Sequence, residues 1–156
     1  MELAFIFVGK AKEAYLEEGV ADYLGRIRRF LRAETRLVRA EPRKGATDEA
    51  QALAREAQRI EAALPSADYV ICLDRGGQAL SSEELARWLE GLMQRGVKRA
   101  AFVIGGVGGL SEEIVRRADL RLSLGPMTFT HQMSRLILLE QVYRALTIRA
   151  GQPYHK

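Results

Sequence analysis

The sequence has little of what disulfides, metal centres and membrane spans require. It holds one cysteine, Cys72, and two histidines in 156 residues. A single cysteine cannot form an intramolecular disulfide, and its place inside an apolar run predicts a buried, small hydrophobic residue. Three such residues cannot readily build a zinc site, so we expect no metal. No apolar run approaches the roughly 18 residues of a membrane span, and no signal pattern is present, so we expect a cytoplasmic protein.

Two common nucleotide-binding motifs are also missing. The segment Gly105–Gly109 holds four glycines after an apolar run, but no Gly-Lys-Ser/Thr follows it, which excludes a P-loop. Gly106-x-Gly108-x-x-Ser111 lacks the third glycine of the dinucleotide fingerprint, and that fingerprint should follow the first strand, where the chain has only Gly9-Lys10. These absences disfavour a nicotinamide or flavin enzyme.

What is present is the composition of an ordinary globular domain. Hydrophobic residues make up 47% of the chain and charged residues 28%, and we find no repeats, low-complexity segments or linkers. The length suits one domain over residues 1–156. The net charge of +4 permits an RNA partner but does not require one.

Strand-like and helix-like segments alternate along the chain. Apolar runs predict strands at residues 3–8, 35–40, 69–74, 100–104 and 120–124. Helical spacing or capping signals predict helices at residues 11–31, 47–64, 81–94, from 111 onwards and 131–149. We take Thr47 and Ser81 as N-caps, Pro65 as a helix end, and Arg75-Gly76-Gly77 as a turn after the third strand. This order predicts an α/β fold with a mostly parallel sheet and its functional loops at one edge.

Two loops in the last third of the chain are the main candidates for a binding site. The first, Gly105–Gly109, leads to Ser111, which reads as the N-cap of a short helix. The second runs from Leu122 to Thr130 and turns at Gly125-Pro126, after which Thr128 or Thr130 can cap the next helix. Strand, glycine loop and helix in this order suit a nucleotide-like ligand at the carboxyl edge of the sheet.

The final helix carries apolar residues over more than one face. We therefore expect it to be buried on two sides, with a second subunit covering part of it in a homodimer. Glu140 and Arg144 are four residues apart and predict an ion pair within the helix.

Two basic segments allow more than one interpretation. Four arginines near the end of the first helix favour a solvated surface, with contact to an RNA backbone as the alternative: Arg26, Arg28, Arg29 and Arg32. The polar loop at residues 41–45 carries Arg43 and Lys44, which could close over a phosphate or over the active site.

Several spaced motifs resemble the RlmH family. They are Ile104-Gly105-Gly106-x-x-Gly109-Leu110, then Leu122-Ser123 and Met127-Thr128-Phe129-x-His131-Gln132-Met133-x-Arg135, then Glu140-Gln141-x-Tyr143-Arg144-Ala145, and the terminal Pro153-Tyr154-His155-Lys156. The similarity extends from Phe7-Val8-Gly9-Lys10 through Leu73-Asp74-x-x-Gly77. These proteins are SPOUT-superfamily methyltransferases that make 3-methylpseudouridine in 23S ribosomal RNA. The resemblance implies a C-terminal trefoil knot, S-adenosylmethionine as methyl donor, and a homodimer.

The resemblance also implies site residues. The positions that match the donor site are Leu73, Gly105, Leu124, Gly125, Pro126, Met127, Thr128 and Phe129. Gly125-Pro126 is a departure from the pattern of the family.

The matching catalytic positions are Arg144, Tyr154 and His155. Methylation of an imide nitrogen requires loss of its proton, so His155 would act as base and Arg144 would stabilise the developing anion. A chain with so little surface suggests that RNA shape or the assembled ribosome supplies specificity. The alternative is a non-catalytic ribosome-binding or RNA-binding module.

Overall fold

The computed structural model describes residues 1–43, 45, 48–64 and 66–155. Five strands and five helices alternate in these ranges. The elements are β1 (Glu2–Val8), α1 (Ala14–Ile27), β2 (Arg32–Val38), α2 (Glu49–Ala63), β3 (Tyr69–Ala79), α3 (Ser82–Gln94), β4 (Arg99–Ile104), α4 (Glu112–Arg117), β5 (Leu120–Ser123) and α5 (His131–Arg149). The predicted α/β fold is confirmed.

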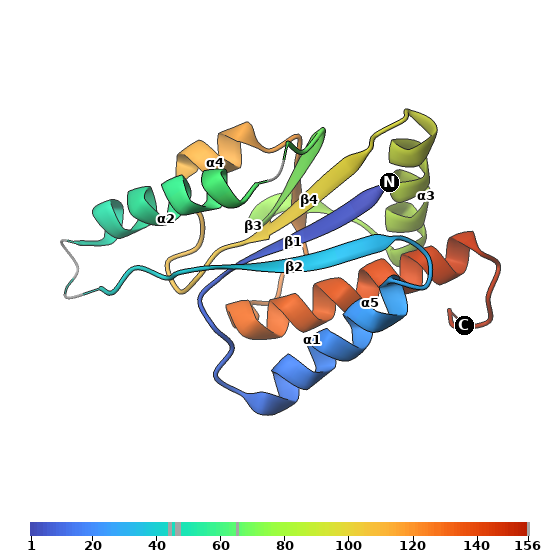
Figure 1. Ribbon diagram of the computed structural model, residues 1–156, viewed down its shortest axis with the longest axis horizontal. Helices are drawn as coiled ribbons and strands as arrows, with labels where there is room; N and C mark the ends of the chain where they lie inside the picture. The colour runs from blue at the N-terminus through green and yellow to red at the C-terminus, as the bar shows by residue number, and fades with distance from the viewer. Residues whose placement is uncertain (44, 46–47, 65, 156) are drawn as a thin grey trace.

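All five strands lie in one sheet, and every pairing is parallel. The strand order is β2-β1-β4-β3-β5, so β4 is the central strand, with β1 on one side and β3 on the other (Figure 1). Parallel pairing brings the carboxyl ends of β3, β4 and β5 to one edge, which is where both candidate loops begin. The trefoil knot implied by the resemblance stays a prediction.

Helices cover both faces of the sheet (Figure 1). On one face, the aromatic side chains of β1 and β4 pack with α1, α3 and α5, and Phe5 stacks on Phe102 with ring centroids 5.4 Å apart. On the other face, Ile6 and Val103 pack with α2 and α4. Successive residues of β1 point to opposite faces, and both faces are buried, which explains the continuous apolar run in its sequence.

Local capping signals locate the starts of three helices. Ser81 and Glu84 form the predicted capping box, Ser111 caps α4, and Thr130, one of the two candidates, caps α5. Helix α1 is shorter than predicted but runs unbroken through Gly19 and Gly25. The predicted cap at Thr47 and helix end at Pro65 lie outside the described residues.

The third strand differs from its prediction. We expected Arg75-Gly76-Gly77 to turn the chain, but β3 continues to Ala79. Its pairing with β5 shifts register between Leu73 and Gln78, so the intervening residues bulge from the ladder. Gly77 crosses so close to the backbone of Arg121 that an added Cβ would lie 2.6 Å from it. The glycines therefore allow a bulge against the neighbouring strand instead of a turn.

The second strand begins earlier than its sequence pattern indicates. We predicted residues 35–40, whereas β2 covers Arg32–Val38 because it pairs with β1 from Glu2 onwards. An edge strand is bounded by its partner as much as by its own alternation.

Helix α5 is buried along its length, as predicted, but the chain itself buries it. Leu139 and Val142 have no exposed surface and belong to the core formed with α1, α3 and the sheet. The wide apolar face of this helix therefore does not require a second subunit. Within the described ranges, no helix has the length and apolar character to span a membrane.

Candidate active site

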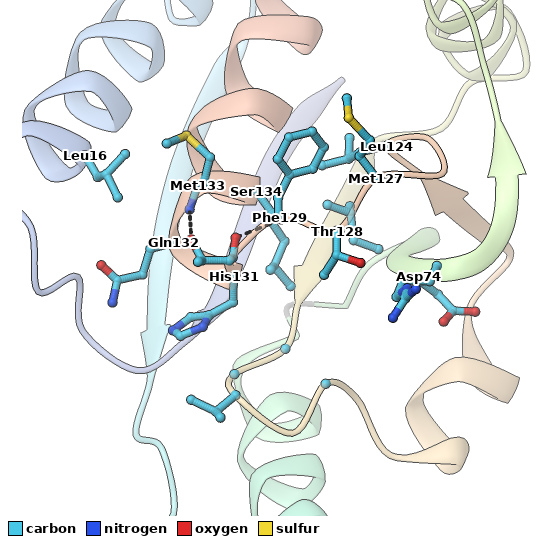
Figure 2. Close-up of a pocket in the computed structure, with 18 of the residues that line it drawn as sticks. Leu16, Asp74, Leu124, Met127, Thr128, Phe129, His131, Gln132, Met133 and Ser134 are labelled. Atoms are coloured by element: carbon cyan, nitrogen blue, oxygen red, sulfur yellow. Dashed lines mark hydrogen bonds between the residues drawn. The ribbon is translucent and has the colours of Figure 1, made fainter.

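A cavity of about 920 Å³ opens at the carboxyl edge of β3, β4 and β5. Both candidate loops line it, together with the segment between β1 and α1 and the first turn of α5. Figure 2 shows Leu16 and Gln132 on one side, Asp74 on the opposite side, and Phe129 beside Leu124 and Met127. The sequence-predicted loops therefore meet in one site.

The first loop is shaped by close backbone approach. The N–H of Gly109 donates to the carbonyl of Gly106 at 3.0 Å, and Gly109 adopts a positive φ of 76°. A Cβ at Gly105 would overlap the backbone of Gly109, so only glycine fits there. The tight turn leaves backbone groups at the cavity wall.

The loop at residues 41–45 does not present Arg43 to the cavity as a free cation. Its guanidinium donates to Glu49 at 2.9 Å and to Glu56 at 3.1 Å, and Glu56 is 1% exposed. These carboxylates, Glu56 first, raise the pKa of Arg43. Arg43 and Glu49 both lie beside Gly108, so their ion pair packs against the glycine loop. Lys44 lies outside the described residues.

The second loop carries most of the predicted donor-site positions. Gly125 turns the chain with a φ of 115°, and its N–H donates to the hydroxyl of Ser123 at 3.2 Å. Met127 extends from the loop and is 73% exposed. Seven of the eight predicted donor-site residues line the cavity, and Pro126 does not.

The cavity rim includes a segment that the sequence analysis missed. Lys12, Glu13, Tyr15 and Leu16 lie between β1 and the first turns of α1. The backbone N–H of Lys12 donates to Oε1 of Gln132 at 2.9 Å, which ties this segment to α5. Gly9-Lys10 after the first strand was the available signal, since the carboxyl end of a central parallel strand reaches the same edge.

His131 is a second residue that the analysis left without a role. It begins α5, lines the cavity, and points away from Phe129 (Figure 2). Burial, with smaller contributions from the charges of Arg135 and Lys12, lowers its pKa below the ordinary value of 6.5. It is therefore neutral at physiological pH.

The predicted catalytic residues form a cluster of their own, away from the cavity. Arg144 donates through Nε at 3.1 Å and Nη2 at 2.5 Å to Oε1 of Glu140, which confirms the predicted ion pair. The hydroxyl of Tyr154 donates to the same oxygen at 3.1 Å and lies 3.2 Å from the hydroxyl of Tyr23. Burial, the Tyr23 hydroxyl and Glu140 raise the pKa of Tyr154, so it stays a proton donor.

His155 is held by a different carboxylate. Its Nε2 lies 2.8 Å from Oε1 of Glu83 on α3. Hydrogen bonds from the Glu83 backbone N–H and the Ser81 side chain, then His155, lower the pKa of Glu83 to about 2. An ionised carboxylate can only accept, so Nε2 carries a proton in this contact, and Nδ1 is the nitrogen that has the lone pair in the matching neutral tautomer. Nδ1 is buried and has no partner in the described ranges.

The cavity lies at the start of α5, whereas Arg144, Tyr154 and His155, here called the tail cluster, lie towards its other end. The first turn of the helix lines the cavity, whereas Arg144 lies ten or more residues further along and the C-terminus lies beyond it (Figure 1). At about 1.5 Å per residue, Arg144 lies about 15 Å along the helix from Ser134, the last residue of α5 at the cavity. One chain therefore gathers the predicted donor positions in the cavity and the predicted catalytic positions in the tail cluster. The two groups of residues do not form one site within that chain.

The cavity suits S-adenosylmethionine on three counts. Its volume falls within the roughly 300–1,000 Å³ of small-molecule sites. Leu73, Leu124 and Phe129 supply apolar wall, and two glycine-bearing loops supply backbone donors and acceptors.

No group of three or more metal-ligating side chains occurs in the described part of the chain.

Comparison with known proteins decides the family. The model of the family described as "Predicted SPOUT methyltransferase" matches residues 1–155. Ribosomal RNA large subunit methyltransferase H of Symbiobacterium thermophilum is 47% identical over 161 residues, with 100% of each chain covered. The chain belongs to the RlmH family of SPOUT methyltransferases.

Two solved structures share the SPOUT fold at low identity. A probable methyltransferase from Bordetella pertussis Tohama I has a TM-score of 0.59 at 15% identity, covering 93% of this chain and 96% of that one. A predicted methyltransferase from Legionella pneumophila, in complex with the bound cofactor SAM, has a TM-score of 0.50 at 14% identity, covering 93% of this chain and 66% of that one.

Membership of the RlmH family makes this protein an enzyme. It is a methyltransferase that uses S-adenosylmethionine. The alternative of a non-catalytic RNA-binding module is therefore set aside.

Proposed function

We propose that this protein methylates N3 of a pseudouridine in the 23S RNA of the assembled ribosome, acting as one domain over residues 1–156. The observation that carries the proposal is the coexistence of a donor-sized cavity with an ordered cluster of Arg144, Tyr154 and His155. The full-length relatives named as large-subunit ribosomal RNA methyltransferases support the RNA substrate.

The two loops and the middle of β3 bind the donor. Leu73, Leu124, Met127 and Phe129 form apolar walls, and backbone groups of Gly105, Gly125 and Thr128 offer hydrogen bonds. Pro126 lies outside the cavity wall and restricts the backbone between Gly125 and Met127. Bound S-adenosylmethionine supplies an electrophilic methyl group on sulfur, and the protein aligns the acceptor with it.

The acceptor nitrogen must lose a proton, and His155 is placed to take it. Glu83 fixes the tautomer with the proton on Nε2, which leaves the Nδ1 lone pair as the base. Because Nδ1 is buried in this conformation, the tail must shift when RNA binds.

Arg144 stabilises the negative charge that develops on the neighbouring carbonyl oxygens. The Nε and Nη2 groups of Arg144 donate to Glu140, so Nη1 is the group that can contact the target nucleobase. The ring of Tyr154, 4.7 Å from the Arg144 guanidinium carbon, offers a stacking surface.

We also propose a homodimer, because Arg144, Tyr154 and His155 do not line the donor cavity of their own chain, and Arg144 lies about 15 Å along α5 from it. Methyl transfer requires contact between donor and acceptor, so one chain cannot complete the reaction in this arrangement. A second copy could place its tail at the cavity of the first. The motivation is this separation rather than the apolar face of α5, which the chain buries by itself.

Subunit complementation tests the homodimer. Gly105→Val should disable the donor site and His155→Ala the acceptor site, each leaving the other site intact. If sites are shared between copies, the mixed variants should regain up to about a quarter of wild-type activity after subunit exchange, because half of the dimers are mixed and each has one intact site of two. Exchange should be verified with differently tagged chains. No recovery despite exchange, or a wild-type monomer in sedimentation at micromolar concentration, would contradict the proposal.

The substrate is tested by comparing naked 23S RNA, isolated large subunits and whole ribosomes that lack the modification. A small domain has little surface for reading sequence, so transfer should be fastest on whole ribosomes. Digestion and mass spectrometry should locate the methyl group at N3 of one pseudouridine. Equal activity on naked RNA would refute the ribosome requirement, and a methyl group elsewhere would refute the assigned product.

A further inference from the structure

The turn between α1 and β2 concentrates positive charge on the surface. Residues 23–33 contain four arginines and no acidic residue. Arg28 follows α1 directly, Arg29 lies in the turn, and Arg32 begins β2. All three side chains belong to exposed residues, so their charges face solvent.

Among the described residues, most arginines form an ion pair with a carboxylate, and these three belong to the minority that do not. Arg55, Arg59, Arg116 and Arg117 all form ion pairs with acidic residues. Arg26 pairs with Asp22 at 2.9 Å. By contrast, Arg28, Arg29 and Arg32 make no ion pair with any described residue. Only Nε of Arg28 is engaged, donating to the carbonyl of Ala33 at 2.8 Å.

The turn lies beside the tail cluster rather than at a remote surface. The ring centroids of Phe30 and Tyr143 are 6.1 Å apart, and those of Tyr143 and Tyr154 are 4.8 Å apart. Tyr23, in the last turns of α1, contacts the Tyr154 hydroxyl. Figure 1 shows the end of α1 and the C-terminus at the same end of the molecule. A chain of aromatic contacts therefore connects the unpaired arginines to the proposed acceptor residues.

We infer that Arg28, Arg29 and Arg32 bind the phosphate backbone of the RNA segment that delivers the target nucleotide to the tail. This inference rests on the proposed function and extends it to a substrate-binding surface. Unpaired guanidinium groups on an exposed turn match closely spaced phosphates in charge and in hydrogen-bonding geometry. The sequence alone favoured a solvated surface, but the missing partners and the adjacent aromatic residues favour RNA.

The test compares two double variants with the same change in net charge. Arg29→Gln/Arg32→Gln removes two unpaired cations and leaves Arg28 with its backbone contact. Arg116→Gln/Arg117→Gln removes two paired cations from α4, on the opposite face of the sheet. Binding of fluorescein-labelled single-stranded RNA is measured by anisotropy at several salt concentrations. Methyl transfer to unmodified ribosomes and binding of S-adenosylmethionine are measured alongside, and circular dichroism verifies folding.

We expect the first variant to lower the slope of log affinity against log salt by about 1.4, since each neutralised phosphate of a single strand contributes about 0.7. KM for ribosomes should rise at least about tenfold, with kcat and donor affinity nearly unchanged. The α4 variant should resemble wild type. If both variants lost RNA affinity equally, net charge alone would explain the loss and the inference would be overturned. Wild-type RNA affinity in the first variant would overturn it as well.

The outcomes also separate this inference from the proposed function. If the first variant loses RNA affinity but wild type transfers no methyl group to ribosomes, the RNA-binding surface is supported and the proposed substrate is refuted. If wild type methylates ribosomes and the first variant does so with unchanged KM, the substrate stands and the surface fails.

Discussion

Removal of Tyr154, His155 and Lys156 should separate donor binding from methyl transfer. The cavity is built from the two loops, the middle of β3, the segment after β1 and the first turn of α5, and it includes neither Tyr154 nor His155. The truncated protein should therefore bind S-adenosylmethionine within about tenfold of wild type, or roughly 1.4 kcal/mol.

The cost to stability follows from the contacts of the tail. Tyr154 pairs edge-on with Tyr143, stacks with Arg144 and donates to Glu140. An aromatic pair contributes about 0.5–1.5 kcal/mol and a hydrogen bond to a charged group about 1.5–3 kcal/mol. Water replaces part of this at a chain end, so we expect a net loss of about 1–3 kcal/mol, which leaves most small domains folded.

The loss in rate should be much larger than the loss in donor affinity. A positioned acid–base group contributes about 100-fold or more, so methyl transfer to ribosomes should fall by at least that factor. Calorimetric titration gives donor affinity, chemical denaturation gives stability, and single-turnover transfer gives the rate. His155→Ala should reproduce much of the rate loss without the stability loss.

Two results would refute this reasoning. Full activity after truncation would show that the tail has no catalytic role. Loss of donor binding by a folded truncated protein would place the tail in the donor site.

Three further predictions follow from single contacts. Glu140→Gln keeps an acceptor oxygen but removes the charge that orients Arg144, so kcat should fall about tenfold while donor affinity is unchanged; an unaltered kcat would refute this role. Gly105→Ala forces the loop apart and should weaken donor binding at least about tenfold in calorimetry, whereas Gly91→Ala, with open space around it on α3, should stabilise the protein by about 0.5–1 kcal/mol. Burial lowers the pKa of His131 in the folded protein, so the unfolded chain binds the proton first as the pH drops. The free energy of unfolding should therefore fall below about pH 6.5, and His131→Gln should remove that pH dependence in denaturation curves.

Features governed by neighbouring residues could be predicted from the sequence. Ser81 and Glu84 interact across one helical turn, Glu140 and Arg144 pair at four residues, and Thr130 caps the helix that it precedes. Such contacts depend on local backbone geometry, which the sequence pattern specifies directly. The alternation of strands and helices likewise predicted a parallel sheet with its loops at one edge.

Part of the site was predictable for a similar reason and part was not. Seven of the predicted donor positions line the cavity because most of them follow strands that end at the same edge of the sheet, and their role in donor binding stays a prediction. The rim at Lys12–Leu16 was missed because its place depends on β1 lying inside the sheet, beside β4. His131 had no distinguishing sequence signal, since its lowered pKa arises from burial in the folded cavity.

The sequence by itself determined the order of helices and strands, the caps at Ser81 and Ser111, and the family to which the chain belongs. Only the tertiary structure decided that the Arg75–Gly77 segment bulges within β3, because that requires β5 as a neighbour. Only the tertiary structure decided that Arg43 pairs with Glu56 and that Arg29 and Arg32 form no ion pair with any described residue. It also decided that Arg144, Tyr154 and His155 gather at the end of α5 opposite the donor cavity. Pairing partners and separations of this kind depend on residues far apart in the chain, which local sequence patterns do not specify.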